Sequence, residues 1–178
     1  MPHHIMVDLE TLGQTPGCSI LSIGAVTFDP HAQKLGDEFY CVVNRASCKE
    51  SGLTEDASTL AWWARQNEAA RKVIAEAETS EIDITAAMIR FASYIWKHDA
   101  KSVRVWGNGS DFDNAILAAC YAATKQAFPW KFWNNRCFRT LKSLNPGVPM
   151  PRGGVYHNAL DDAKTQASAA IKMLQNHK

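Results

Sequence analysis

The stretch IMVDLETLG, residues 5–13, decides the fold. Three apolar residues predict a buried strand, and they lead into Asp8 and Glu10, which are separated only by Leu9. Alternate residues of a strand point to the same face, so both carboxylates project together at the strand's carboxyl end, where open α/β sheets place their ligands. Two such carboxylates repel each other unless one is protonated or a cation lies between them, and oxygen ligands suit Mg²⁺ or Mn²⁺. The alternative is an ordinary strand end with solvated acids.

The composition is that of an ordinary globular protein. The chain has 178 residues, of which 46% are hydrophobic and 21% charged, so we expect one domain spanning residues 1–178. No segment is long enough to cross a membrane, and the first residues, MPHHIM, do not resemble a signal peptide. The five cysteines include no CxxC pair, which is typical of reduced thiols. We therefore expect a cytoplasmic protein with no membrane partner.

The charge is unevenly distributed although the net charge is only +1. No Asp or Glu occurs between residues 114 and 160. That stretch interleaves basic with aromatic residues: Lys125, Lys131, Arg136, Arg139, Lys142 and Arg152 with Phe128, Trp130, Phe132, Trp133, Phe138 and Tyr156. Basic and aromatic side chains together suit a strand of nucleic acid. The alternative is a positive solvated face over a partly aromatic core, which this stretch taken alone slightly favours.

The order of the predicted elements indicates one α/β domain with a mixed sheet and flanking helices. Strands are predicted at residues 4–10, 18–28 and 38–44, with a turn at 29–37 that makes the last two antiparallel. Helical patterns follow at 59–77 and 81–98, a strand at 102–108, and helices at 111–125 and 157–178. Residues 137–144 fit a strand or a helix, and 145–154 form a Pro- and Gly-rich loop.

A second acidic motif is WGNGSDFDN, residues 106–114, where a strand turns through two glycines into a helix. Asp111 is the expected N-cap, because its side chain can accept an amide hydrogen bond from the first turn. Asp113 then lies inside that turn, where the helix dipole favours its ionised form. Both acids could equally serve only to start the helix.

A third motif, YHNALDDA at residues 156–163, opens the closing helix. Asn158 is the expected N-cap, and Asp161 and Asp162 lie in the first turn. Asp162 adjoins the stripe that contains Ala159 and Ala163, so we expect it to face the sheet. His157 precedes the helix and is either a surface histidine or part of the same site.

Taken together and in this order, the three motifs resemble those of the DEDDh 3′→5′ exonucleases of the ribonuclease-H-like (DnaQ-like) superfamily. The segments LGQTPGCSILSIGAVTFDP, WWARQ and WGNGSDFDN are more specifically similar to a small branch with phage DexA, exonuclease VIII-like and mycobacterial-type exoribonuclease proteins. The resemblance covers nearly the whole chain. It implies two Mg²⁺ or Mn²⁺ ions held by four acids, and a histidine general base; the residues concerned are Asp8, Glu10, Asp113, Asp162 and His157.

The resemblance also implies a substrate and its contacts. Thr11 and Leu12 correspond to residues that meet the 3′ hydroxyl and wedge against the last base, while Phe112 and Arg139 are further candidate contacts. We expect hydrolysis from the 3′ ends of single-stranded DNA or RNA, with DNA favoured, releasing nucleoside 5′-monophosphates, and related enzymes are often homodimers. The competing hypotheses are a catalytically weak nucleic-acid-binding module, a structure-specific endonuclease and a two-metal phosphatase. Of the adjacent tryptophans, Trp62 and Trp63, we expect one in the core and one at the cleft.

Overall fold

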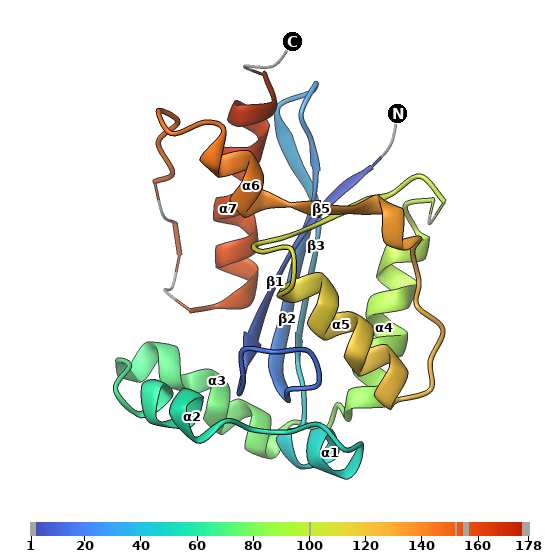
Figure 1. Cartoon of the computed structure of the whole chain (residues 1–178), viewed down its shortest axis with the longest axis vertical. Coiled ribbons are helices and arrows are strands. Elements are labelled where there is room, and N and C mark those ends of the chain that lie inside the picture. Colours follow the sequence, from blue (N-terminus) through green and yellow to red (C-terminus); the bar gives the residue numbers. More distant parts are fainter. Residues whose placement is uncertain (1–2, 100, 152, 155–156, 176–178) are drawn as a thin grey trace.

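A computed structural model describes residues 3–99, 101–151, 153–154 and 157–175. Its centre is a five-stranded sheet with the strand order β3-β2-β1-β4-β5 (Figure 1). β1 (His4–Thr11), β2 (Ile20–Asp29) and β3 (Lys34–Val42) form an antiparallel meander. β4 (Arg104–Gly107) pairs parallel to β1, and β5 (Asn135–Cys137) pairs parallel to β4. The predicted α/β fold with a mixed sheet is therefore confirmed.

Helices cover both faces of this sheet and its lower end (Figure 1). α4 (Ile84–Trp96) and α5 (Asp113–Ala123) pack on one face, and α6 (Phe138–Ser143) and α7 (Ala159–Gln175) on the other. α1 (Arg45–Glu50), α2 (Ala57–Ala64) and α3 (Glu68–Thr79) lie across the end of the sheet. A 3-10 helix, η1 (Phe132–Asn134), precedes β5.

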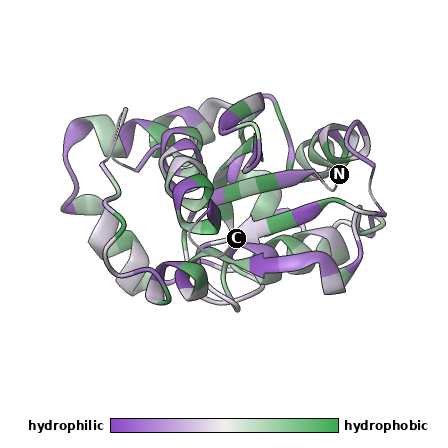
Figure 2. Ribbon diagram, turned by 90° about the horizontal axis from the view of Figure 1, so that it is seen from above, coloured by the Kyte–Doolittle hydropathy of each residue, from purple (hydrophilic) through white to green (hydrophobic). Residues whose placement is uncertain are grey.

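The central strands are apolar because helices bury them on both sides. Every residue of β1 except Asp8 is buried, as is every residue of β2 except Asp29. Figure 2 shows the corresponding hydrophobic stretches along the strands in the middle of the molecule. A charged side chain within β1 therefore stands out against its surroundings. No helix among the described residues is both long and apolar enough to span a bilayer.

Three predictions about local structure were wrong, and other elements were not predicted. The turn between β2 and β3 is shorter than residues 29–37, because β3 already begins at Lys34. The single helix predicted over 59–77 is two helices, since the side chain of Asn67 accepts a hydrogen bond from Ala70 N and caps a new helix, α3. Helix α1 was not predicted. Asp111 is not the N-cap of α5; that position belongs to Phe112, which makes no side-chain capping bond.

Candidate active site

The end of β1 and the start of α7 meet because residue 24 is a glycine. Gly24 pairs with Asp8 in the β1–β2 ladder. A Cβ atom on Gly24 would lie 2.1 Å from the carbonyl carbon of Ala159 and 2.2 Å from Leu160 N. Only a residue without a side chain lets the first turn of α7 approach β2 this closely. This contact brings the third acidic motif beside the first.

The first turn of α7 orients its two acids differently. Asn158 caps the helix as predicted, because its Oδ1 accepts hydrogen bonds from Leu160 N and Asp161 N at 3.1 and 3.2 Å. Asp161 packs against Gly154, where a Cβ atom would lie 2.3 Å from the Asp161 carboxyl group. Asp162 instead lines the cavity that contains Asp8. The orientation expected for Asp162 is confirmed.

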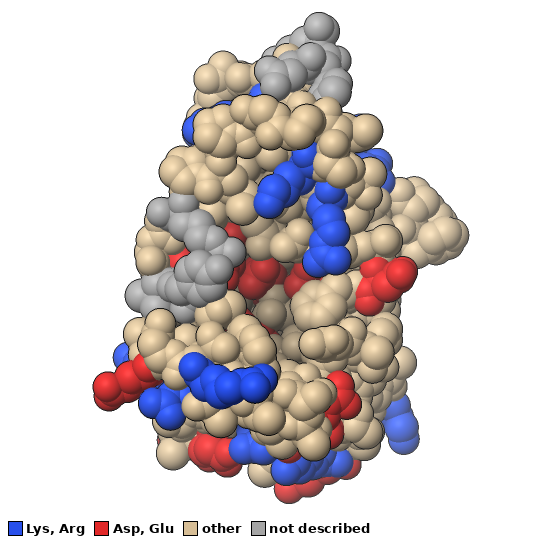
Figure 3. Space-filling model, turned by 60° about the vertical axis from the view of Figure 1, so that its left-hand side comes forward, with Lys and Arg blue, Asp and Glu red and all other residues tan. Residues whose placement is uncertain are grey.

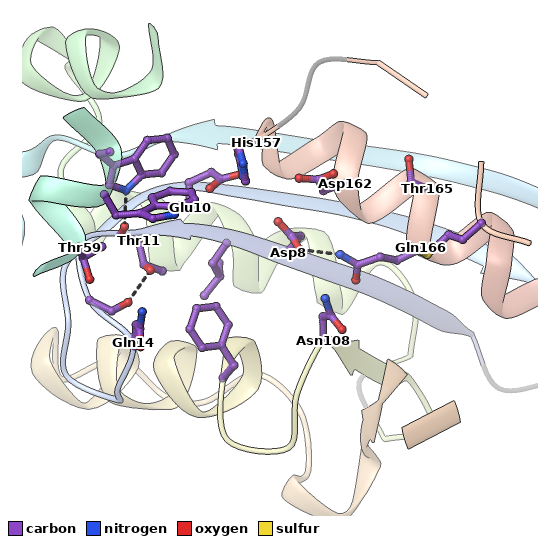
Figure 4. A pocket seen from close by; sticks show the side chains of 16 residues that line it. Asp8, Glu10, Thr11, Gln14, Thr59, Asn108, His157, Asp162, Thr165 and Gln166 are labelled. Atoms are coloured by element: carbon purple, nitrogen blue, oxygen red, sulfur yellow. Dashed lines mark hydrogen bonds between the residues drawn. The ribbon is translucent and has the colours of Figure 1, made fainter. Parts of the chain in front are cut away.

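This cavity has a volume of about 300 Å³ and collects side chains from all three motifs. Asp8 and Glu10 come from β1, and His157 and Asp162 come from the start of α7 (Figure 4). Ligand atoms of Glu10, His157 and Asp162 all lie within 4.8 Å of one another, a spacing that can hold a metal ion. The chain thus brings residues about 150 positions apart into one oxygen- and nitrogen-lined site.

Two tryptophans of α2 line the cavity next to His157. Trp63 is buried and donates a hydrogen bond from Nε1 to Thr11 O at 2.9 Å. Trp62 is 38% exposed, and its ring meets the His157 ring edge-on at a centroid distance of 5.0 Å. His157 also lies 6.1 Å from the Trp63 ring. The expectation that one tryptophan is core and one reaches the cleft is confirmed, although both contribute to the cavity wall.

Asp113 occupies a different position from the other three acids. Its carboxylate accepts hydrogen bonds from Leu9 N at 3.1 Å and from Asn108 N at 2.6 Å, so it ties α5 to the end of β1 and to the preceding turn. Each carboxylate oxygen retains a second lone pair. Asp113 is almost fully buried and does not line the cavity, yet its charge acts on both Asp8 and Glu10.

The crowded acids resist ionisation. Burial raises the pKa of Asp8 well above its usual range, and Asp113 and Glu10 raise it further. Burial, followed by the nearby charges of Asp162 and Asp113, raises the pKa of Glu10 to about 8.

For Asp113, burial raises the pKa to about 6, although the two backbone amides oppose the shift. A divalent cation would relieve the repulsion among the four carboxylates. The carboxylates and the imidazole of His157 are ligands that fit such an ion.

The predicted substrate contacts fall into two groups. Thr11 and Phe112 line the cavity. Leu12 does not: it is completely buried in a cluster with Leu21 and Trp63. The β1–β2 pairing shifts register between Glu10 and Thr11, where Leu21 of β2 is skipped, and Leu12 follows the last residue of β1. Leu9, the residue between the two acids, is among the apolar residues that line the cavity, together with Met150 and Phe112.

Arg139 stands at the margin of the site. It is exposed on α6, and its Cζ lies 3.7 Å from the position a Cβ would take on Gly109. Its positive charge lowers the pKa of Asp113, so it acts on the acids electrostatically without lining the cavity.

Several cavity residues were not predicted, notably Gln14, Thr59, Asn108, Thr165 and Gln166. Gln166 is the most informative, because it donates a hydrogen bond from Nε2 to Asp8 Oδ1 at 2.7 Å. Its position four residues after Asp162 places both on one helix face, a spacing visible in the sequence. Thr165 precedes Gln166 on the same helix, whereas Gln14 and Asn108 come from turns and Thr59 from α2, whose approach depends on tertiary packing.

This sheet order, with acids of β1 and α7 around one cavity and a buried acid at the start of α5 bonded to the end of β1, is that of the ribonuclease-H-like nucleases of the DEDDh type. The family model described as the 3′-5′ exoribonuclease Rv2179c-like domain matches residues 3–174. The chain therefore belongs to this family, and it is a 3′-5′ exonuclease. The resemblance to DEDDh exonucleases is thereby confirmed.

Individual proteins show the same likeness. An exodeoxyribonuclease of Enterobacteria phage T4 is 26% identical over 189 residues, covering 88% of this chain and 82% of the phage protein. The nuclease domain of 3′hExo, described as a DEDDh family member bound to rAMP, has a TM-score of 0.67 at 15% identity, over 98% of this chain and 92% of that one. E. coli Exonuclease I in complex with a 5cy-dT13 oligonucleotide has a TM-score of 0.70 at 14% identity. The match covers 100% of this chain and 41% of Exonuclease I. Likeness at this identity shows the shared fold.

Proposed function

We propose that the protein removes nucleotides one at a time from the 3′ end of single-stranded nucleic acid, using two divalent ions and His157 as general base. The observation that carries the proposal is the meeting of Glu10, His157 and Asp162 within 4.8 Å, in the cavity that also contains Asp8. A protein that only binds nucleic acid would not need such an arrangement. Burying these acids costs folding free energy, as the raised pKa values of Asp8 and Glu10 indicate.

Asp8, Glu10 and Asp162 would hold the ions, with Asp113, which accepts a hydrogen bond from Leu9 N, supporting them. The four carboxylates repel one another without a cation, so they form a preorganised site for Mg²⁺ or Mn²⁺. When bound, the ions would neutralise the phosphodiester and stabilise the charge that develops on the leaving 3′ oxygen.

His157 would accept a proton from the water that attacks phosphorus. The water oxygen forms a new bond to phosphorus, the bond to the 3′ oxygen of the preceding nucleotide breaks, and a nucleoside 5′-monophosphate leaves. The edges of Trp62 and Trp63 limit the positions the imidazole can take. Leu9, Thr11 and Phe112 provide the wall against which the terminal nucleotide would rest.

The choice between DNA and RNA rests on relatives that differ. The matching family is described as an exoribonuclease domain, whereas the phage relative is an exodeoxyribonuclease. We propose DNA as the preferred substrate, because the phage relative matches across most of both chains. We further propose that residues 1–178 act as a single domain in the cytoplasm.

The experiment is hydrolysis of 5′-labelled single-stranded DNA and RNA of matched sequence, each with Mg²⁺ and with Mn²⁺. A ladder that shortens one nucleotide at a time, with mononucleotide products, is expected. Internal cuts would establish an endonuclease instead, and release of inorganic phosphate a phosphatase. Binding without hydrolysis under every metal condition would establish a binding module.

A further inference from the structure

The acid-free stretch seen in the sequence separates into buried and exposed aromatic residues. Trp130 and Phe138 are 4% and 1% exposed, so they belong to the core. Phe132 and Trp133 are 74% and 60% exposed and lie next to each other in η1. Two large exposed rings in adjacent positions need an explanation beyond core packing.

The exposed rings are held in place. Their centroids lie 5.0 Å apart in an edge-on arrangement, and Lys131 Nζ lies 5.9 Å from the Trp133 ring centroid. Arg136 donates from Nη1 to Trp133 O at 3.0 Å, and the buried Asn134 side chain donates to Lys101 O at 3.0 Å. We call Lys131, Phe132, Trp133 and Arg136 the η1 platform. Because its backbone is anchored, ordering it on a ligand loses little conformational entropy.

The charge of the η1 platform is positive and uncompensated. Within the part of the chain that the structure describes, neither Lys131 nor Arg136 forms an ion pair with an acidic side chain. Arg104 on the neighbouring strand adds to the positive field around Arg136. Exposed rings with unpaired cations match bases and phosphates together, whereas a protein partner's apolar surface would leave these cations without a counter-charge.

The η1 platform lies within reach of a strand that ends in the active site. In the sheet register Arg136 pairs with Trp106 and Trp106 with Met6, two residues before Asp8. With strand spacings of about 4.8 Å and about 3.3 Å per residue, Arg136 lies roughly 12 Å from Asp8, and the rings of Phe132 and Trp133, four and three residues earlier, lie roughly 20 Å from it. That distance is about six nucleotides when stacked at about 3.4 Å each.

A basic side chain lies at the margin of the cavity, on the helix that follows β5. Arg139 follows β5 on α6 and stands beside Gly109 at the margin of the site. Figure 3 shows basic side chains directly beside the hollow in which acidic side chains are visible. The surface between the η1 platform and the cavity therefore favours a phosphate backbone.

We propose that the η1 platform binds single-stranded nucleic acid upstream of the cleavage site, stacking bases on Phe132 and Trp133 while Lys131 and Arg136 contact phosphates. The proposal rests on the exonuclease function proposed above, because it takes the 3′ end to lie at Asp8. Substrates long enough to reach η1 are then held more tightly than short ones.

The test compares the Phe132→Ala/Trp133→Ala double variant with the wild type on a 3-mer and a 20-mer that share their 3′ sequence, as DNA and as RNA. The KM for the 20-mer should rise about tenfold or more, since each stacked base contributes strongly. The 3-mer, too short to reach η1, should be hydrolysed as by the wild type. The matched control is Ile89→Ala/Trp96→Ala, which truncates two exposed apolar side chains on α4, outside the η1 platform. These side chains are 49% and 57% exposed.

Fluorescence anisotropy of a labelled 20-mer in EDTA measures binding without hydrolysis. The double variant should bind more weakly, and Lys131→Ala should reduce the slope of log K against log salt by about 0.7. This assay still reports on the η1 platform if the wild type hydrolyses no oligonucleotide, which would refute the proposed function instead.

Three results would overturn the proposal: an unchanged KM and affinity for the 20-mer, an equal loss on both lengths, or an equal loss in the α4 control. Light scattering supplies a fourth. A homodimer in the wild type that becomes a monomer in the double variant would assign Phe132 and Trp133 to self-association.

Discussion

Gln166 on α7 donates a hydrogen bond to Asp8 on β1, with 2.7 Å between Nε2 and Oδ1. The amide is buried, and its Oε1 has no hydrogen-bond partner among the described residues. A neutral donor fixes one oxygen of Asp8 without neutralising the carboxylate, which leaves the second oxygen for a cation. Gln166 thereby couples the position of α7 to the orientation of the first acid of the site.

Replacing Gln166 by Leu should raise the metal concentration needed for half-maximal activity about 10- to 100-fold, the usual effect of removing a group that orients a ligand. Calorimetric titration with Mn²⁺ should show the same loss of affinity, and saturating metal should restore much of the rate. Gln175→Leu is the matched control, because Gln175 lies on the same helix and donates to Pro30 O at the far end. An unchanged metal requirement in Gln166→Leu would show that Gln166 does not orient Asp8 for metal binding.

Asp162→Asn should abolish hydrolysis while the domain remains folded. In the absence of metal the variant should be more stable than the wild type by roughly 0.5–2 kcal/mol, because one of the mutually repelling carboxylates is gone. Circular dichroism, thermal unfolding in EDTA and the nuclease assay measure the three effects. Asp161→Asn is the control one residue away, on the side of α7 that faces Gly154. If the two variants behave alike, the assignment of Asp162 fails.

The stability of the metal-free protein should fall as pH rises from 6.5 to 8. Glu10 keeps its proton up to a pKa of about 8 in the folded chain but loses it near 4.5 in the unfolded chain. The folded state therefore binds more protons in this window, and the free energy of unfolding decreases with pH. His4 does not interfere, since burial lowers its pKa to about 4 and its effect is complete above its ordinary value of 6.5.

Thermal unfolding in EDTA at several pH values measures this slope. The Glu10→Gln variant should flatten it, and added Mg²⁺ or Mn²⁺ should raise the melting temperature most at pH 8. A melting temperature that climbs with pH in the wild type would contradict the raised pKa.

Gly24→Ala should move the start of α7, with Asp162, away from Asp8 and Glu10 on β1. The new methyl group would meet backbone atoms of Ala159 and Leu160, which cannot move without shifting α7. We expect a loss of about 1–3 kcal/mol in stability, typical of overpacking, together with a loss of metal affinity. Gly147→Ala is the control, because its Cβ would meet nothing within 4 Å. Wild-type metal binding in Gly24→Ala would show that α7 is positioned by other contacts.

The sequence was sufficient to predict the direction of a side chain where the period of one strand or one helix determines it. Strand alternation predicted that Asp8 and Glu10 project together, and the alanine stripe of α7 predicted that Asp162, not Asp161, turns inward. Both inferences depend only on local spacing within one regular element. They identified most of the cavity's acids because β1 and α7 are long and nearly uniformly apolar on their inner faces.

The failures have tertiary causes. Leu12 was assigned to the substrate by the family resemblance, whereas its burial against Leu21 and Trp63 depends on packing beyond the end of β1, which the sequence does not specify. Asp113 could not be distinguished from a helix cap, since its partners, the amides of Leu9 and Asn108, come from other segments. The break at Asn67 was hidden by a continuous helical pattern on both sides. Each case depends on contacts between elements that periodicity does not specify.

The His157 ring lies close enough to Glu10 and Asp162 to share an ion with them, so its proposed role as a base is tested against that of a metal ligand. A general base must be neutral to accept a proton. At saturating metal, wild-type activity should therefore rise with pH through the range in which histidines titrate, roughly pH 5 to 8, and then level off. His157→Ala should lower the rate about 10²- to 10⁴-fold and flatten this rise.

Metal affinity separates the base from a ligand. If His157 is the base, His157→Ala should bind Mn²⁺ with nearly wild-type affinity in calorimetry, because the four carboxylates remain. His31→Ala is the control, an exposed histidine at the turn between β2 and β3, and it should change neither rate nor affinity. Loss of Mn²⁺ binding together with activity in His157→Ala would make His157 a ligand and leave the attacking water to another acceptor. A normal rate with an unchanged pH profile would exclude His157 from the reaction, since neither a base nor a ligand can be removed without consequence.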